Sequence, residues 1–193
     1  MQTGNKTNTL VKLGMLAALG VVLMLATRFS IIPSAPFLKY DAGDVAALVA
    51  GFVFGPLYGL CVVVVTAIIQ TISVDQDAGL IGMFAHIAAT GVFVVISAII
   101  YKKFHTIGGA LVALLTGAIC MSVVMIFMNL FVFLPLYLPG SSPTTIWTYI
   151  TTAIIPFNLI KGILNSILTF AIYKASSRYL AKEALLFRKS KNQ

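Results

Sequence analysis

Six stretches of apolar residues, separated by short polar or glycine- and proline-containing segments, divide this chain. Most of them are long enough to cross a bilayer, because a helix rises ~1.5 Å per residue and needs ~20 residues to span the hydrocarbon core. The pattern therefore predicts an all-α integral membrane protein, a bundle of six transmembrane helices. The predicted spans are approximately residues 10–29, 44–54, 57–73, 80–101, 108–134 and 147–174.

The first two spans needed a choice between interpretations. Residues 44–54 are few for a full crossing, and Pro56, between Gly55 and Gly59, favours a turn over one helix that continues into the third span. The first span follows a weakly basic start, as a cleaved signal peptide would. Its apolar run is too long, however, and no small-x-small cleavage site follows it. We therefore expect a retained first helix.

The composition agrees with a membrane protein and leaves little material for a soluble domain. Of 193 residues, 60% are hydrophobic and 9% are charged, and the mean hydropathy is +1.02. No water-soluble domain of this size needs so much apolar surface, so we treat residues 1–193 as a single membrane domain. Cys61 and Cys120 lie within apolar runs and are interpreted as small buried hydrophobic residues.

The charged residues predict the orientation of the helices. If both termini are cytoplasmic, ten of the thirteen basic residues lie inside, as the positive-inside rule expects. The net charge of +8 is then mostly an orientation signal; the basic cytoplasmic tail at 175–193 can touch anionic lipid, and nucleic acid is not an expected partner. Asp41, Asp44, Asp75 and Asp77 are predicted at the outer ends. The ten basic residues are Lys6, Lys12, Lys102, Lys103, Lys174, Arg178, Lys182, Arg188, Lys189 and Lys191.

The chain lacks the motifs of the common enzyme classes. It has no Walker A phosphate loop, so we do not expect it to hydrolyse ATP alone, and it has neither an H-E-x-x-H helix nor a G-x-S-x-G elbow. His86, in the fourth span, is more readily explained as a hydrogen-bonded helix contact than as a metal ligand. We therefore predict a protein that is not an enzyme and needs neither a metal nor a cofactor.

Three polar residues in apolar spans predict a binding site. Lys161 lies near the middle of the last span. Inserting a lysine there costs roughly 2.5–3.5 kcal/mol, so a lysine at such a position usually has a function. Asn158 lies three residues earlier on the same helical face. Asn129, in the fifth span, joins them if the two helices are antiparallel neighbours; alone it would be explained as a helix–helix hydrogen bond. Two amides and an ammonium suit a planar, carbonyl-rich ligand with an apolar body.

The segment Pro33–Asp44 is a second candidate region. It contains two prolines, then Asp41 and Asp44 at the start of the second span. The simple interpretation is that Asp44 caps this helix, where a carboxylate accepts unpaired N–H bonds and suits the helix dipole. The functional interpretation is a loop over an outward-facing pocket that offers polar groups to a ligand. Both can hold together.

Four segments of the sequence resemble those of the S components, or substrate-binding subunits, of energy-coupling factor (ECF) vitamin transporters, and most of all the riboflavin-specific ones. The resemblance is carried by residues 37–45, 51–56, 129–137 and 155–162, and does not extend past about Leu180. It implies six helices with cytoplasmic termini and a riboflavin site in the outer half of the bundle. Asn129, Asn158 and Lys161 would bind the isoalloxazine ring, with a backbone contact near Leu38 and Asp41 close to the ligand.

The same resemblance implies partners in a cell membrane, expected to be a bacterial cytoplasmic membrane. Riboflavin would be a transported substrate, and ATP would be used only by two ATPase subunits that act through a transmembrane coupling subunit. A strip of small residues on the first helix, Gly14, Ala17 and Ala18, would dock on that coupling subunit, since small residues permit close helix approach. Alternatively, these residues pack within the bundle.

Two other functions are compatible with parts of this sequence. An S component for a different vitamin would have the same fold and partner face with a different pocket. A stand-alone carrier or channel is less well supported. Many carriers have an internal repeat with paired broken helices, which does not appear here, and a pore would need more polar residues along several helices.

Overall fold

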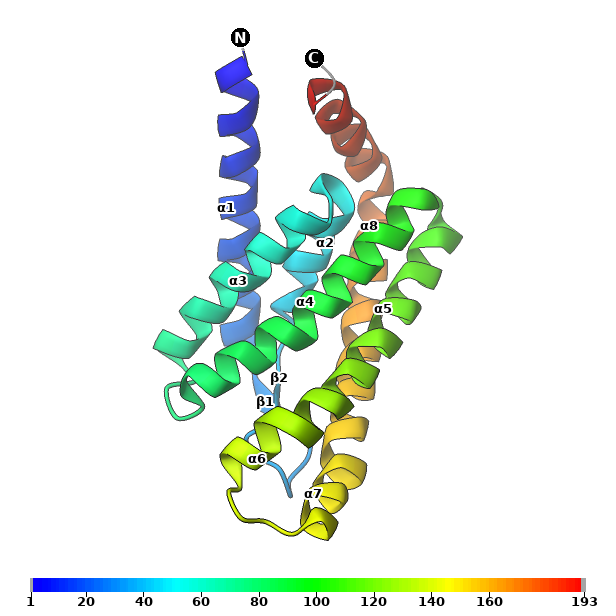
Figure 1. The fold of residues 1–193 in the computed structure, drawn as a ribbon. Helices are drawn as coiled ribbons and strands as arrows, with labels where there is room; N and C mark the ends of the chain where they lie inside the picture. Colours follow the sequence, from blue (N-terminus) through cyan, green and yellow to red (C-terminus); the bar gives the residue numbers. More distant parts are fainter. Residues whose placement is uncertain (1, 192–193) are drawn as a thin grey trace.

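The computed structural model describes the backbone of residues 2–191 and the side chains of residues 7–175. Its helices form a bundle with one small two-stranded hairpin (Figure 1). Two segments, η1 and η2, are π-helical turns inserted in longer helices. The elements are α1 (Gln2–Thr27), β1 (Phe29–Ser30), β2 (Lys39–Tyr40), α2 (Asp44–Phe54), α3 (Pro56–Ser73), α4 (Gly79–Lys103), α5 (Ile107–Met128), η1 (Asn129–Phe133), α6 (Leu134–Tyr137), α7 (Pro143–Tyr149), η2 (Ile150–Ile154) and α8 (Ile155–Lys191).

The helices confirm the membrane-spanning pattern that hydropathy predicted. Within the described residues, five helical runs are long and apolar enough to cross a bilayer: 7–27, 56–73, 79–103, 107–137 and 143–175. The fourth run combines α5, η1 and α6, and the fifth combines α7, η2 and most of α8. Large apolar side chains such as Leu10, Leu57 and Phe127 point outward, as a lipid-facing surface requires. The remaining predicted span, the second one at residues 44–54, is the shorter helix α2.

The two ends of the bundle differ in what they contain. The first turns of α1 and the last turns of α8 lie at one end, while the hairpin, α6 and α7 lie at the other (Figure 1). Lys102 and Lys103 end α4 on the side of the termini, whereas Asp75 and Asp77 lie in the connection between α3 and α4. The side chains of Lys6 and of the predicted basic tail after residue 175 lie outside the described part, although α8 continues to Lys191.

Helix α2 is a half-length helix enclosed by the rest of the bundle. All eleven of its residues are buried, and it packs against α1, α3, α4 and α8. At ~1.5 Å per residue it covers only about half of the hydrocarbon core. It ends at Gly55, whose φ of 107° is a conformation that glycine adopts readily and other residues avoid. This turn brings α3 back along α2, as the Pro56 pattern predicted.

The start of α2 differs from the expectation. Residues 28–43 turn back into the bundle, where the Thr27 hydroxyl accepts a hydrogen bond of 2.9 Å from the Ala42 amide. As a result, Asp41 and Asp44 are only 1% and 3% exposed. The carboxylates are enclosed because the chain enters the bundle before α2 begins, which the position of an apolar run does not reveal.

Candidate functional site

A cavity of about 610 Å³ lies in the half of the bundle that carries the hairpin. This volume is within the range of small-molecule sites, which are typically apolar with a few polar groups that fix orientation. Its walls come from the loop before β2, the α3–α4 connection, α4, the α5–α6 run and α8. Apolar lining residues include Phe37, Met125, Phe133, Leu134, Ile154 and Phe157; polar ones are Lys39, Gln70, Asp75, Asp77, His86, Asn129, Asn158 and Lys161.

The structure brings most of the predicted site residues together. Leu38, Asn129, Asn158 and Lys161 all line this cavity. They come from three separate segments that only the tertiary fold makes neighbours. Asp41 is not among the lining residues: it lies behind the wall, where its carboxylate accepts a 2.9 Å hydrogen bond from the Gly43 amide.

The two asparagines are held in the same way. The Asn129 amide nitrogen donates to the Met125 carbonyl and that of Asn158 donates to the Ile154 carbonyl, both at 2.8 Å. Each bond runs back one turn along its own helix and fixes the side chain. Asn129 is also the first residue of η1, and Asn158 follows η2 by one turn. π-helical turns are frequent at functional sites, where the inserted residue changes the direction of the side chains that follow.

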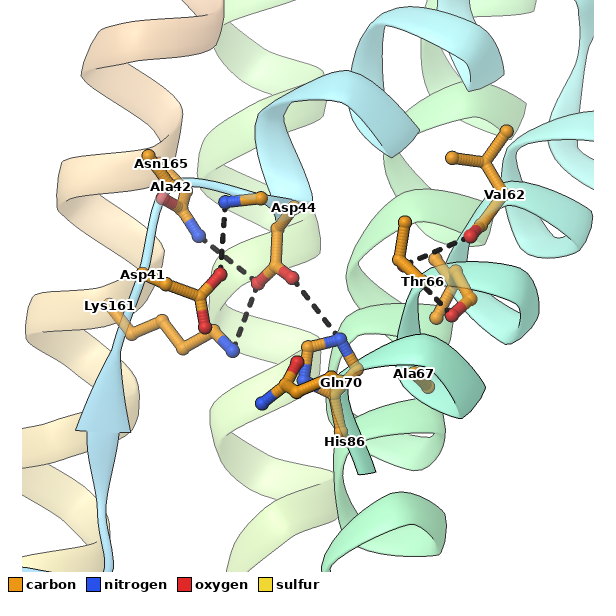
Figure 2. Close-up of polar contacts among 12 residues, drawn as sticks. Asp41, Ala42, Asp44, Val62, Thr66, Ala67, Gln70, His86, Lys161 and Asn165 are labelled. Carbon is orange, nitrogen blue, oxygen red and sulfur yellow. Dashed lines mark hydrogen bonds and ion pairs between the residues drawn. The ribbon is translucent and has the colours of Figure 1, made fainter. Parts of the chain in front are cut away.

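Lys161 does not face the cavity as an isolated charge. Its ammonium lies 2.9 Å from an Asp44 carboxylate oxygen, and the His86 imidazole nitrogen Nε2 lies 3.4 Å from the other oxygen (Figure 2). The Asn165 amide donates to Asp44 at 3.1 Å and accepts from the Tyr40 hydroxyl at 3.0 Å. A buried charge needs such compensation, because an unpaired one costs several kcal/mol.

Sequence reasoning missed this role of Asp44. Gly43 precedes α2 at the capping position, with no side-chain capping bond, and the Asp44 carboxylate is turned toward α4 and α8 instead. The capping hypothesis for Asp44 was therefore wrong. His86 does make the kind of helix contact that was predicted, but it also lines the cavity. One signal was available: an acid at the start of an apolar span could balance the lysine in another.

A second group of charges lies at the rim of the cavity. Asp75, between α3 and α4, forms an ion pair with Arg28, lies 3.7 Å from the Lys39 ammonium and accepts a 2.7 Å hydrogen bond from Gln70. Partial burial opposes ionisation, but hydrogen bonds from Arg28 and Gln70 and the charges of Arg28 and Lys39 outweigh it and hold the pKa of Asp75 below its usual value. Sequence reasoning assigned no role to this segment.

The rim also has an aromatic contact. The rings of Phe37 and Tyr137 lie 6.4 Å apart, and the Tyr137 hydroxyl donates to the Ala78 carbonyl at 3.3 Å. Together with the Arg28–Asp75 pair, these contacts join the hairpin segment, the α3–α4 connection and α6 around the cavity.

The residues predicted to dock a partner do not share one environment. Gly14 and Ala18 are exposed on α1, and among the described residues no atom outside the local helix backbone lies within 4 Å of a side-chain carbon added at Gly14. Ala17 is 7% exposed and packs in the main apolar core. Among the described residues, no cluster of three or more histidine, cysteine or acidic side chains could hold a metal ion.

A bundle of apolar helices around a cavity lined by amides and by ammonium groups paired with carboxylates defines a membrane-embedded protein that binds a small solute. The chain belongs to the family described as ECF transporter, substrate-specific component, which it matches over residues 8–173. It is therefore a multi-pass membrane protein of a transport system and not an enzyme.

Relatives of this chain include proteins that are named as riboflavin transporters. The chain is 33% identical over 175 residues to the riboflavin transporter FmnP of Bacillus subtilis, covering 87% of this chain and 91% of that one. It is 32% identical over 177 residues to the riboflavin transporter RibU of Staphylococcus aureus, covering 90% and 92%. A solved structure of the S component of a bacterial ECF transporter superimposes with a TM-score of 0.76 at 32% identity, covering 91% and 98% of the two chains.

Proposed function

We propose that this chain is the riboflavin-binding subunit of an ECF-type importer. One observation carries the proposal: Asn129, Asn158 and Lys161, polar residues in two apolar spans, line a single cavity. The named relatives are riboflavin transporters, which favours riboflavin over another vitamin.

The chemistry of the cavity fits a flavin. An isoalloxazine ring is planar, with carbonyl and N–H groups along one edge and an apolar body. The two amides and the ammonium offer both donors and acceptors to such an edge. The apolar walls, including Phe133 and Phe157, suit the body of the ring. Leu38, which also lines the cavity, would offer a backbone group, and Asp41 would act from behind the wall.

The proposed transport cycle needs partners. The chain would capture riboflavin from outside and release it inside when joined to a transmembrane coupling subunit and two ATPases, with both termini in the cytoplasm. The absence of a nucleotide-binding motif is the reason to place ATP hydrolysis in other subunits. For docking, the exposed Gly14 and Ala18 are the better candidates, because Ala17 packs inside.

The substrate is tested by an absorbance spectrum of the detergent-purified protein after dialysis, followed by a fluorescence titration with riboflavin. We expect a retained flavin band, and quenching of added riboflavin by protein freed of flavin. Asn129→Ala and Asn158→Ala should each weaken binding by about tenfold, because each removes a hydrogen bond to the ring. A colourless protein that fails to quench riboflavin would contradict the proposal and leave only the family assignment.

The docking surface is tested by adding bulk to α1. Gly14→Leu and Ala18→Leu should leave riboflavin binding unchanged and reduce uptake in cells that contain the complete complex. Ala26→Leu is a matched control, since Ala26 is also exposed on α1 but lies about two turns beyond Ala18. Loss of binding in the Gly14 or Ala18 variant, or equal loss of uptake in all three, would contradict this surface.

A further inference from the structure

Asp44 lies behind the wall of the cavity and is joined to it by two residues that line the cavity. Lys161 and His86 are lining residues, whereas Asp44 is not, and its side chain is only 2% exposed. Figure 2 shows the carboxylate between the lysine on α8 and the histidine on α4, with Asn165 above them. The carboxylate thus joins α2, α4 and α8 at one point.

The geometry limits where the lysine ammonium can go. A lysine side chain has a long flexible stem and three donors, so in an apolar surrounding its position follows its acceptors. Asp44 supplies an acceptor at 2.9 Å. Asn165, one turn after Lys161 on α8, donates to the same carboxylate oxygen and is itself held by the Tyr40 hydroxyl. Tyr40 therefore fixes Asn165, Asn165 fixes the Asp44 carboxylate, and the carboxylate fixes the Lys161 ammonium.

We propose that Asp44 is a positioning residue for substrate binding: it holds the Lys161 ammonium at the cavity wall, with the remaining donors directed to the ligand, and does not touch the ligand itself. The inference rests on the proposed function. It also implies that the charge offered by Lys161 is balanced from within the protein, so the site suits a neutral polar ring and needs no anionic group on the substrate.

If Asp44 only stabilised its own helix, its carboxylate would make different contacts. An acid in the first turn of a helix normally accepts from backbone N–H groups of that turn. Here the carboxylate contacts side chains of other helices, Lys161 and Asn165 on α8 and His86 on α4. Its partners therefore belong to the cavity wall and its support.

A double-mutant cycle tests the proposal, with riboflavin affinity measured by fluorescence quenching for the parent, Asp44→Asn, Lys161→Met and the double variant. Asn is isosteric with Asp, and Met keeps most of the length of Lys without the charge. If Asp44 acts through Lys161, Asp44→Asn weakens binding at least about tenfold in the parent, because a charge-assisted hydrogen bond is lost. In the Lys161→Met background the same change alters affinity by less than about twofold.

Two results would overturn the proposal: an Asp44→Asn variant that binds like the parent, or a loss that is just as large when Lys161 is already Met. Should Asp44→Asn fail to fold, a tenfold loss in the double variant relative to Lys161→Met would still overturn the proposal, and the double variant is expected to fold because removing both charges avoids an unpaired buried one. Thr66→Val is the matched control. Thr66 is a buried polar residue on α3 that donates only within its own helix, to Val62 and Val63, and does not line the cavity (Figure 2).

The parent titration separates this test from that of the function. If the parent does not bind riboflavin, the proposed function fails before the cycle begins. If the parent binds and the cycle shows independent effects, only the role of Asp44 fails.

Discussion

Within the described residues, two ion clusters each place an aspartate beside basic side chains, but in different settings. In the first, Asp44 pairs with Lys161 inside the bundle, and the two side chains are 2% and 6% exposed. In the second, Asp75 pairs with Arg28 and Lys39 at the rim, and the side chains are 12–39% exposed. The inner cluster is held by helices, whereas the rim cluster joins connecting segments.

This difference determines what each cluster can contribute. A buried pair costs desolvation, and removing one partner is strongly destabilising because the other charge is left unpaired. A partly exposed pair is screened by water and salt and contributes little to stability. The inner cluster is thus suited to hold a fixed geometry, and the rim cluster is suited to contacts that form and break as a ligand passes.

The largest effect is expected from breaking the inner pair. Lys161→Ala should lower the free energy of unfolding of the ligand-free protein by about 3–5 kcal/mol, because it leaves Asp44 buried without its cation. Adding Asp44→Asn to this variant should recover part of the loss. Thermal unfolding in detergent, followed by circular dichroism, measures both. A Lys161→Ala variant as stable as the parent would show that the two clusters do not differ in this way.

A smaller effect is expected at Tyr40, which is connected to the inner pair through Asn165. Tyr40→Phe removes the hydrogen bond to Asn165 and should cost about 1 kcal/mol. Burial, with the charges of Asp44 and Asp41, raises the pKa of Tyr40 to about 12. In the unfolded chain a tyrosine titrates near pH ~10. The stability linked to the protonated phenol is therefore present below that pH and is lost as the pH rises toward about 12.

The measurement for Tyr40 is the unfolding midpoint of parent and variant as the pH rises from neutral. The parent should be more stable at neutral pH, and its advantage should shrink above pH ~10. An advantage that is absent at neutral pH, or that grows on the alkaline side, would contradict the assigned hydrogen bond and the direction of the pKa.

The smallest effect is expected at the rim. Asp75→Asn should change the free energy of unfolding by about 0–1 kcal/mol, and less at high salt. Because the pKa of Asp75 is lowered in the folded protein, its contribution is present above pH ~4 and is lost as the pH falls through the folded value. Salt and acid titrations of the unfolding midpoint check this. A loss as large as that of Lys161→Ala would remove the distinction between the two clusters.

The membrane spans and half of the candidate site could be predicted from the sequence alone. Long apolar runs predict helices in a bilayer because every backbone group must be bonded within the segment, so the pattern is strong. Asn129, Asn158 and Lys161 were found because a polar residue in such a run is costly and therefore conspicuous. Their common cavity confirms only that they are neighbours; their contact with riboflavin remains a prediction.

The residues that sequence reasoning missed lie at helix ends and in connections. Asp44 resembled a helix cap, and its depth depends on the path of residues 28–43, which no local pattern specifies. Asp75, Asp77 and Gln70 line the cavity because the α3–α4 connection lies beside the hairpin, a tertiary relation. The π-helical turns next to the two asparagines also left no signal, since the hydrophobic pattern continues through them.

The enclosed position of α2 has a consequence for the order in which the protein is made. Eleven residues that begin with an aspartate cannot insert into lipid as a stable independent segment. The partners of Asp44 on α8 come late in the chain; Asn165, one of them, follows it by 121 residues. During synthesis, α2 therefore has to wait, at the membrane surface or in the insertion machinery, until the last helix emerges. Chains that end before α8 should expose this segment to quality-control proteases, whereas chains that lack only residues after 175 should survive.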